Sequence, residues 1–199
     1  MTALHDLAQA IGLNVRSGRI GRGWTLDELA LRSGVSRRML VQVEQAQTNP
    51  SVSTLLRLSE ALGVGLPQLL AVSDSGALQV VPAGQAPVLW RGDHGGQGRL
   101  LGGTGPPDVL ELWDWTMHVG EVHASEPHSR GTREQLLVVS GHLMLAVGIE
   151  EQVLGPGDAA AFPGDRWHRY QAATDTGRPV RFTLSVLQPG VGAGTPVPP

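Results

Sequence analysis

The sequence of 199 residues contains no cysteine, which excludes disulfide bonds and metal sites built on thiolates. Lysine is absent as well, so every basic residue is an arginine, and we draw no function from that bias. No apolar stretch reaches the roughly 18–20 residues that cross a bilayer. The first twenty residues lack the basic and apolar regions of a secretion signal. We therefore expect a cytoplasmic protein with no membrane partner.

Charge is unevenly distributed along the chain. Hydrophobic residues make up 41% of it, enough for packed cores, and the length suits two small domains. The net charge of −3 alone would argue against a nucleic-acid partner. However, residues 1–71 carry seven arginines against five acidic residues, whereas residues 72–199 carry eight against thirteen. We therefore expect any contact with a polyanion in the first part of the chain.

The first 71 residues have the apolar spacing and the boundary residues of five short helices. Thr25 and Glu28 have the spacing of a capping box, in which each side chain bonds a backbone N–H of the other's turn. Further cap, turn and helix-end residues follow: Gly34, Ser36, Ser51, Gly63 and Pro67. This part of the chain is therefore predicted to be all-α.

Residues 26–45 carry a position-specific pattern. Ala30 is a small residue where two helices would cross, and Gly34 allows a left-handed turn between them. Apolar core positions follow at Val35, Leu40 and Val43. With these matches the segment resembles the helix-turn-helix of XRE/Cro-C1-type transcriptional regulators. The resemblance implies a five-helix, lambda-repressor-like domain that binds double-stranded DNA; the alternative is a helical bundle with another partner.

The resemblance also implies which residues lie at the DNA, because the second helix of this motif enters the major groove. The expected contacts are Thr25, Ser36, Arg37, Arg38, Gln42, Asn49 and Ser51. Arginine can bind guanine and glutamine can bind adenine through paired hydrogen bonds. Hydroxyl and amide side chains at helix starts suit phosphate, and Ser36 can serve as a helix cap instead. For the arginines, the alternative is a solvated helix face.

Two features near the end of this motif concern structure. The family usually has glycine two residues after Glu44, where this chain has Ala46. We therefore expect a strained or different turn there. Arg19 and Glu44 occupy positions that often form an ion pair in this family, and we predict that they pair and act structurally.

Beyond residue 78 the pattern changes to short strands. Residues 109–119 alternate in polarity, with Glu111, Trp113, Trp115 and Met117 on one face. Residues 136–148 predict two strands around Ser140 and Gly141, and residues 181–187 predict another. Such spacing indicates a sandwich or barrel. The glycine-rich stretch 92–108 is expected to be a poorly ordered loop or hairpin.

Two spaced motifs carry a second resemblance. The first consists of Glu126, His128, Glu134 and Gly141, and the second of Gly157, Pro163 and His168. With this spacing, residues 126–170 resemble a cupin, an all-β, double-stranded β-helix of jelly-roll type. The resemblance implies a cupin domain at 79–188 after a linker at 72–78, with a disordered tail at 189–199.

The cupin resemblance implies a divalent metal, such as Zn, Fe, Mn or Ni, held by His128, Glu134 and His168. Glu126 replaces the first histidine of the motif, so direct binding of an organic ligand without metal, or an empty pocket, stays equally open. Glu126 or His123 could add a fourth ligand, although His118 and His123 are otherwise expected at the surface. Three aromatic residues can wall a ligand cavity or simply form core: Trp113, Trp115 and Tyr170.

Together the two resemblances imply a homodimeric transcriptional regulator that binds a near-palindromic operator and senses a small-molecule effector. The alternative is a metal-dependent cupin enzyme fused to a DNA-binding domain. The altered first motif counts against an enzyme, because metal catalysis needs firm ligands and an open position. A toxin–antitoxin or phage-type repressor is a third possibility, for which the cupin half is unexpected.

Overall fold

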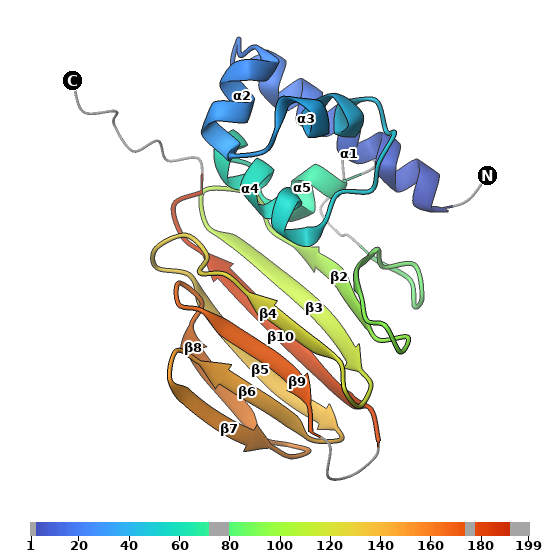
Figure 1. Ribbon diagram of the computed structural model, residues 1–199, viewed down its shortest axis with the longest axis vertical. Helices are drawn as coiled ribbons and strands as arrows, with labels where there is room; N and C mark the ends of the chain where they lie inside the picture. The colour runs from blue at the N-terminus through green and yellow to red at the C-terminus, as the bar shows by residue number, and fades with distance from the viewer. Residues whose placement is uncertain (1–2, 72–79, 174–177, 192–199) are drawn as a thin grey trace. The chain divides into compact units, whose positions relative to one another are not determined.

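The computed structural model describes residues 3–71, 80–173 and 178–191 (Figure 1). The chain divides into two compact units, a helical one and a sheet-rich one, and each is described by itself. The expected linker at 72–78 and most of the expected tail at 189–199 lie outside the described residues. The domain bounds 1–71 and 79–188 therefore stay predictions.

The helical unit contains the five predicted helices. They are α1 (Ala3–Gly21), α2 (Leu26–Ser33), α3 (Arg37–Glu44), α4 (Val52–Leu62) and α5 (Leu66–Leu70). The core that joins them consists of fully buried apolar side chains, among them Leu29, Leu40, Leu55, Leu58 and Leu62. None of the described helices is long and apolar enough to cross a membrane.

Local capping explains where these helices begin and end. The Thr25 hydroxyl accepts the Glu28 N–H at 3.1 Å, and the Glu28 carboxylate accepts the Thr25 N–H at 2.7 Å, which confirms the capping box. Ser36 and Ser51 cap α3 and α4 in the same way through their hydroxyls. Gly34 ends α2 at a φ of 65°, a backbone conformation that glycine adopts without steric cost.

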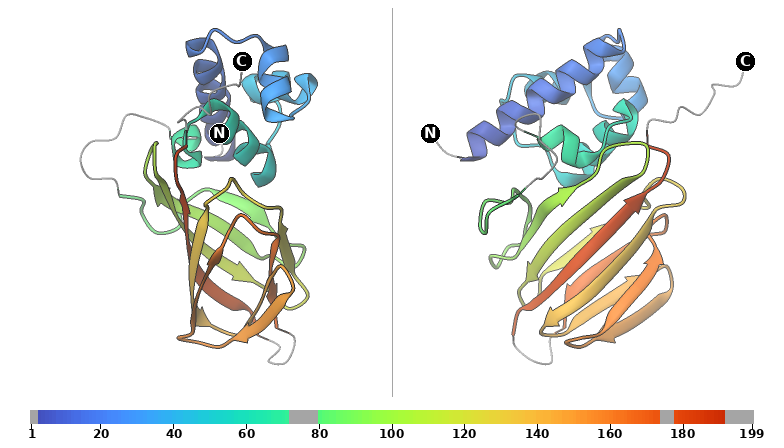
Figure 2. Two further views of the ribbon diagram at one scale, coloured as in Figure 1. Left: turned by 90° about the vertical axis from the view of Figure 1, so that its left-hand side faces the viewer. Right: turned by 180° about the vertical axis from the view of Figure 1, so that it is seen from behind.

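The second unit is all-β, as predicted, and its described residues form ten strands in two sheets (Figure 2). The six-stranded sheet has the order β1 (Val88–Arg91), β2 (Gln97–Gly103), β3 (Val109–Met117), β10 (Val180–Gln188), β5 (Arg133–Ser140) and β8 (Ala159–Pro163). The four-stranded sheet has the order β4 (Val122–Ser125), β9 (His168–Ala172), β6 (Leu143–Val147) and β7 (Glu150–Leu154).

The turn at Ser140 and Gly141 joins two different sheets. The predicted strands on its two sides are β5 and β6, and they belong to the six-stranded and four-stranded sheets respectively. Gly141 has a φ of 72°, and a Cβ there would lie 2.4 Å from the Pro179 carbonyl oxygen. Glycine is therefore required sterically where the chain crosses between the layers.

Of the two structures expected for the glycine-rich stretch 92–108, the hairpin is confirmed, and the expected poor order is wrong for the strand within it. Residues 97–103 form β2, which pairs with β1 and places Trp90 opposite Gly98. A Cβ on Gly98 would lie 2.8 Å from the ring of Trp115. The absent side chain leaves room for a buried indole, and the strand is held by backbone pairing.

Candidate functional site

The residues expected at DNA lie on α2, α3 and the start of α4. Six of the seven are exposed, namely Thr25, Ser36, Arg37, Arg38, Asn49 and Ser51, and Gln42 is half-buried. The three hydroxyl side chains are engaged as helix caps. Arg37 pairs with Asp27, with 3.1 Å between Nε and Oδ1 and both side chains largely exposed. Arg38 is exposed on α3, and Gln42 lies one turn further along the same helix.

A buried ion pair supports α3 from behind. The Arg19 guanidinium donates to both oxygens of Glu44, at 2.6 and 2.8 Å, and its third contact is the Trp24 carbonyl at 2.9 Å. The two side chains are only 14% and 7% exposed. The predicted pair is therefore confirmed, and it joins the end of α1 to the end of α3.

The turn after α3 is strained, as predicted from its missing glycine. Ala46 has a φ of 55°, the left-handed region that costs a residue with a Cβ roughly 1–2 kcal/mol. The turn is closed by two backbone bonds, from Ala46 N–H to Val43 O and from Gln47 N–H to Gln42 O. These bonds hold the alanine in the position where the family has glycine.

The three predicted metal ligands come together inside the barrel. Glu134 lies on β5, His168 on β9, and His128 in the segment between β4 and β5. The Nε2 atoms of His128 and His168 lie 3.2 and 3.3 Å from Glu134 Oε1, and all three ligand atoms lie within 4.8 Å of one another. Glu134 and His168 are almost fully buried. Two imidazole nitrogens and one carboxylate oxygen are a donor set that fits a divalent transition metal.

Neighbouring groups orient this cluster. The Tyr170 hydroxyl donates to Glu134 Oε2, and His168 Nδ1 lies 2.9 Å from the Arg166 carbonyl oxygen. A proton on Nδ1 leaves His168 Nε2 free to accept or to ligate. Ser125 Oγ lies 3.4 Å from His128 Nε2.

Electrostatics favour an ionised Glu134. Burial acts to raise the pKa of Glu134, but the hydrogen bond from His128 and the charges of His168 and His128 hold that pKa below its ordinary value. Burial raises the pKa of Tyr170 well above its ordinary value, and the negative charge of Glu134 adds to this effect. Tyr170 therefore remains a hydrogen-bond donor to a carboxylate.

The three expected aromatic wall residues also lie together. Trp113 and Trp115 project inward from β3 and Tyr170 from β9, and all three are buried. The Trp115 ring lies 5.9 Å from Trp113 and 6.0 Å from Tyr170, measured between centroids. These are the packing distances of an aromatic core.

Two residues near this cluster are buried in a way that the sequence did not predict. Glu111 is buried on β3, and burial raises its pKa to about 7, although a hydrogen bond from Trp113 opposes the rise. His123, expected at the surface, lies 4.9 Å from Trp115 and stacks parallel to Tyr170. These ring contacts hold His123 away from the surface, so that expectation was wrong. Burial, with the nearby His168, lowers the pKa of His123 to about 4.

The suggested fourth ligands do not join the group. Among the described residues, the cluster of ligand atoms contains only His128, Glu134 and His168. Glu126 is exposed, and His123 is held among aromatic rings.

The signal that could have identified the burial of Glu111 was the alternation along β3, which places Glu111 on the same face as Trp113.

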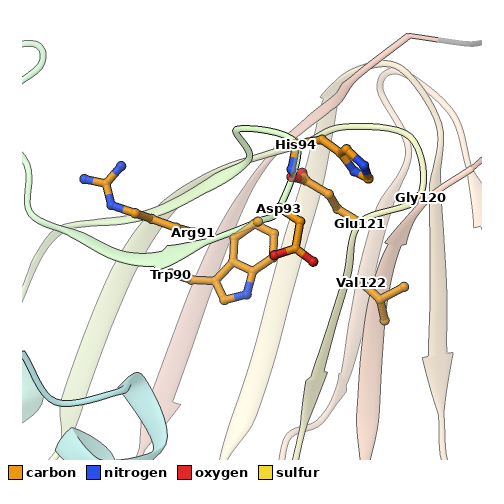
Figure 3. Close-up of a pocket in the computed structure, with 8 residues that line it drawn as sticks. Trp90, Arg91, Asp93, His94, Gly120, Glu121 and Val122 are labelled. Carbon is orange, nitrogen blue, oxygen red and sulfur yellow. Dashed lines mark hydrogen bonds between the residues drawn. The ribbon is translucent and has the colours of Figure 1, made fainter.

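A pocket beside the β1–β2 turn is a separate feature (Figure 3). It is lined by Trp90, Arg91, Gly92, Asp93, His94, Gly120, Glu121 and Val122. The Glu121 carboxylate accepts the backbone N–H groups of His94 at 2.7 Å, Gly96 at 3.0 Å and His118 at 2.6 Å. Burial acts to raise the Glu121 pKa, but these donors lower it overall. This carboxylate is therefore used to hold two turns together.

Comparisons with known proteins agree with both units. A family model described as Helix-turn-helix matches residues 15–69, and one described as Cupin domain matches residues 113–187. The HTH-type transcriptional regulator SutR of Escherichia coli (strain K12) is similar along nearly its whole length. It is 30% identical over 169 residues, which cover 84% of this chain and 90% of that protein.

Two further proteins are similar. An uncharacterized HTH-type transcriptional regulator of Sinorhizobium fredii is 36% identical over 69 residues, covering 35% of this chain and 90% of that protein. The crystal structure of an HTH_3 family transcriptional regulator from Vibrio cholerae has a TM-score of 0.68 at 23% identity, covering 94% of this chain and 99% of that one. This structural similarity shows that the two chains share a fold.

Proposed function

Since the chain belongs to the HTH-type transcriptional regulators that carry a cupin domain, we propose that it binds a specific operator and senses a small-molecule effector in its barrel. The observation that carries this proposal is the convergence of His128, Glu134 and His168 in the barrel of a protein whose other unit is a helix-turn-helix. Effector binding would then change the affinity for DNA, which requires different effector affinities in the two states.

The exposed face of α3 supports sequence-specific binding. Arg38 and Gln42 lie one turn apart on this helix, and Arg38 is exposed. Arg37 is already paired with Asp27, so it is better suited to phosphate or to a supporting role. We therefore assign the main base contact to Arg38 and phosphate contacts to the helix starts at Thr25 and Ser51, with Asn49 beside Ser51.

This assignment is tested by selecting an operator from random duplexes and comparing variants at a fixed salt concentration. Arg38→Ala should weaken operator binding by roughly 1–3 kcal/mol and relax the preference at one base pair. Arg57→Ala removes the same charge from the exposed surface of α4, outside the motif, and is the matched control. Equal effects of the two substitutions would show that Arg38 contributes only a general electrostatic attraction to DNA and contacts no base.

The buried cluster supports a metal-dependent sensor. His128, Glu134 and His168 would hold the metal, and the ion would supply a Lewis-acid centre for an oxygen or nitrogen atom of the effector. Tyr170 and the Arg166 carbonyl would orient Glu134 and His168 respectively. The identity of the metal, among Zn, Fe, Mn and Ni, is decided by metal analysis of the purified protein.

The sensing role is tested with the paired substitution of His128 and His168 by alanine. We expect this variant to lose bound metal and the effector response, with the His94→Ala variant as an exposed control. A normal response in the paired variant would leave the barrel as a dimerisation module. Turnover of a ligand identified by mass spectrometry would favour the alternative, a cupin enzyme fused to a DNA-binding domain.

We also propose a homodimer. One recognition helix reads only a few base pairs, whereas two helices related by a two-fold axis read half-sites about 34 Å apart. The operator should accordingly be near-palindromic.

A further inference from the structure

Two buried polar side chains of the barrel have hydrogen-bonding atoms without partners. Glu111 is 1% exposed; its Oε2 accepts the Trp113 indole N–H at 2.9 Å, while Oε1 has no partner among the described residues. Gln188 is also 1% exposed, and neither its amide oxygen nor its amide nitrogen has a partner there. Buried polar groups are rarely left without partners, because each lost hydrogen bond destabilises the fold.

These side chains lie at the same end of one sheet. Glu111 is near the start of β3 and Gln188 is the last residue of β10, which lies between β3 and β5. β10 runs antiparallel to β5 and places Val186 opposite Glu134. Figures 1 and 2 show that β3 begins where β10 ends. Alternating burial along the strands turns Glu111, Gln188 and Glu134 to the same inner face.

Glu111 lies near the predicted metal ligands but is separate from them. Glu111 and Glu134 both lie at buried positions on strands of the six-stranded sheet, and the charges of His128 and Glu134 act on the Glu111 carboxyl group. Glu111 is nevertheless absent from the group of ligand atoms that lie within 4.8 Å of one another. Its unpartnered oxygen is therefore available to a hydrogen-bond donor other than the predicted metal ligands.

We propose that Glu111 and Gln188 form a subsite that binds the protonated amine of a small organic ligand. The ammonium group would donate to Glu111 Oε1 and Gln188 Oε1, and the Gln188 amide nitrogen would donate to a neighbouring acceptor of the ligand. This inference rests on the proposed function, since the ligand would be the effector of the same barrel.

A bound cation favours the ionised form of Glu111, and with that group ionised the charge of the interior selects a cation. The buried ionisable residues of the barrel, among those described, are Glu111, Glu121, Glu134, His168 and Tyr170, and no arginine is buried with them. Glu121 already accepts three backbone N–H groups, and Glu134 already has two imidazoles and Tyr170. The buried carboxylate oxygens without a hydrogen-bond partner among the described residues are Glu111 Oε1 and Glu134 Oε1. Glu134 Oε1 has the imidazoles of His128 and His168 within 3.3 Å, whereas Glu111 Oε1 has no such neighbour in the group of ligand atoms. The indole of Trp113, which bonds Glu111, places an aromatic ring beside this carboxylate, and aromatic rings suit an organic cation.

The probes for the test are n-butylammonium, n-butanol and butyrate, which share one chain and differ in charge. The readout is the indole N–H signal of Trp113 in a two-dimensional NMR spectrum of the whole protein, assigned from a Trp113→Phe variant. Because this N–H donates to Glu111, its shift reports on that carboxylate. The variants are Glu111→Gln and Gln188→Met, with Glu150→Gln on the exposed edge of β7 as the matched control.

We expect n-butylammonium to shift the Trp113 signal in a saturable way. Its affinity for the Glu111→Gln variant should be lower than for the wild type by a factor of about ten or more. Gln188→Met should weaken it in the same direction, and Glu150→Gln should leave it unchanged. Tighter binding of butyrate, equal binding of ammonium by the Glu111→Gln variant, or no saturable shift with ammonium would each overturn the subsite. If the Glu111→Gln variant does not fold, an unchanged affinity of the Gln188→Met variant for n-butylammonium is enough to overturn the subsite.

Operator affinity of the wild-type protein, measured with and without n-butylammonium, separates the two proposals. Ammonium binding to a protein that binds no operator would support the subsite and overturn the regulatory function. Operator binding by a protein that takes no ammonium would support the function and overturn the subsite.

Discussion

At the scale of single residues, Glu111 makes the stability of the barrel depend on pH. Its pKa is raised mainly by burial, from an ordinary value of 4.5 to about 7 in the fold. Between these values the folded protein holds a proton that the unfolded chain has released. Stability contributed by this group is therefore full below pH 4.5 and is lost as the pH rises through about 7.

The free energies of unfolding of the wild type and the Glu111→Gln variant are compared in the presence of a chelator. The wild type should lose up to about 3 kcal/mol relative to the variant between pH 4.5 and pH 8. Chemical unfolding at each pH measures the difference. The Glu150→Gln variant, altered on an exposed strand, should follow the wild type throughout. A difference between wild type and Glu111→Gln that does not change with pH would mean that Glu111 is not buried as a neutral acid.

Two ion pairs that join helices of the helical unit contribute unequally to its stability. Arg19 on α1 and Glu44 on α3 are nearly buried, whereas Arg37 on α3 and Asp27 on α2 are 60% and 77% exposed. Removing one partner of a buried pair leaves a charge without compensation, while exposed pairs contribute little.

We therefore expect Glu44→Ala to destabilise the helical unit by roughly 3 kcal/mol, the lower end of the range for buried pairs. Asp27→Ala should change stability by less than about 1 kcal/mol. Thermal unfolding followed by circular dichroism at 222 nm measures both. Melting of Glu44→Ala within a degree of the wild type would show that solvent compensates Arg19.

The sequence predicted those elements whose signals are local. Thr25, Ser36 and Gly34 determine helix ends through contacts within one turn, and the structure has these caps as predicted. The sequence left residues 97–103 open between loop and hairpin, because the stability of β2 comes from pairing with β1 and from the close approach of Trp115, neither of which a glycine-rich stretch reveals. The convergence of His128, Glu134 and His168 followed from motif spacing, but the free oxygen of Glu111 depends on packing between distant strands.

At the scale of the whole molecule, the outer face of the six-stranded sheet is rich in exposed apolar side chains. Three adjacent strands, β3, β10 and β5, carry them. They are Leu110, Leu112, Leu137, Val139 and Leu187, each between 40% and 47% exposed. Apolar residues gathered in this way are typical of an interface. In the proposed homodimer, a second copy of the chain would cover this outer face.

The prediction is that Leu112→Glu combined with Leu137→Glu converts a dimer to a monomer at micromolar concentration, because two copies would bury like charges. Sedimentation velocity measures the change, and operator affinity should fall with it. Ile149→Glu changes a fully exposed residue of the β6–β7 turn and is the matched control. Wild-type protein that sediments as a monomer, with and without operator, would contradict the dimer.

Glu134 also has a mechanical consequence, because its partners lie on the opposite layer of the barrel. The carboxylate belongs to β5 of one sheet, whereas His168 and Tyr170 belong to β9 of the other. The Glu134 side chain links the two sheets, and a ligand bound to it would set the distance between them. Since β5 also carries Leu137 and Val139 on its outer side, an occupant that changes this gap would strain the strand that bears the outer apolar face.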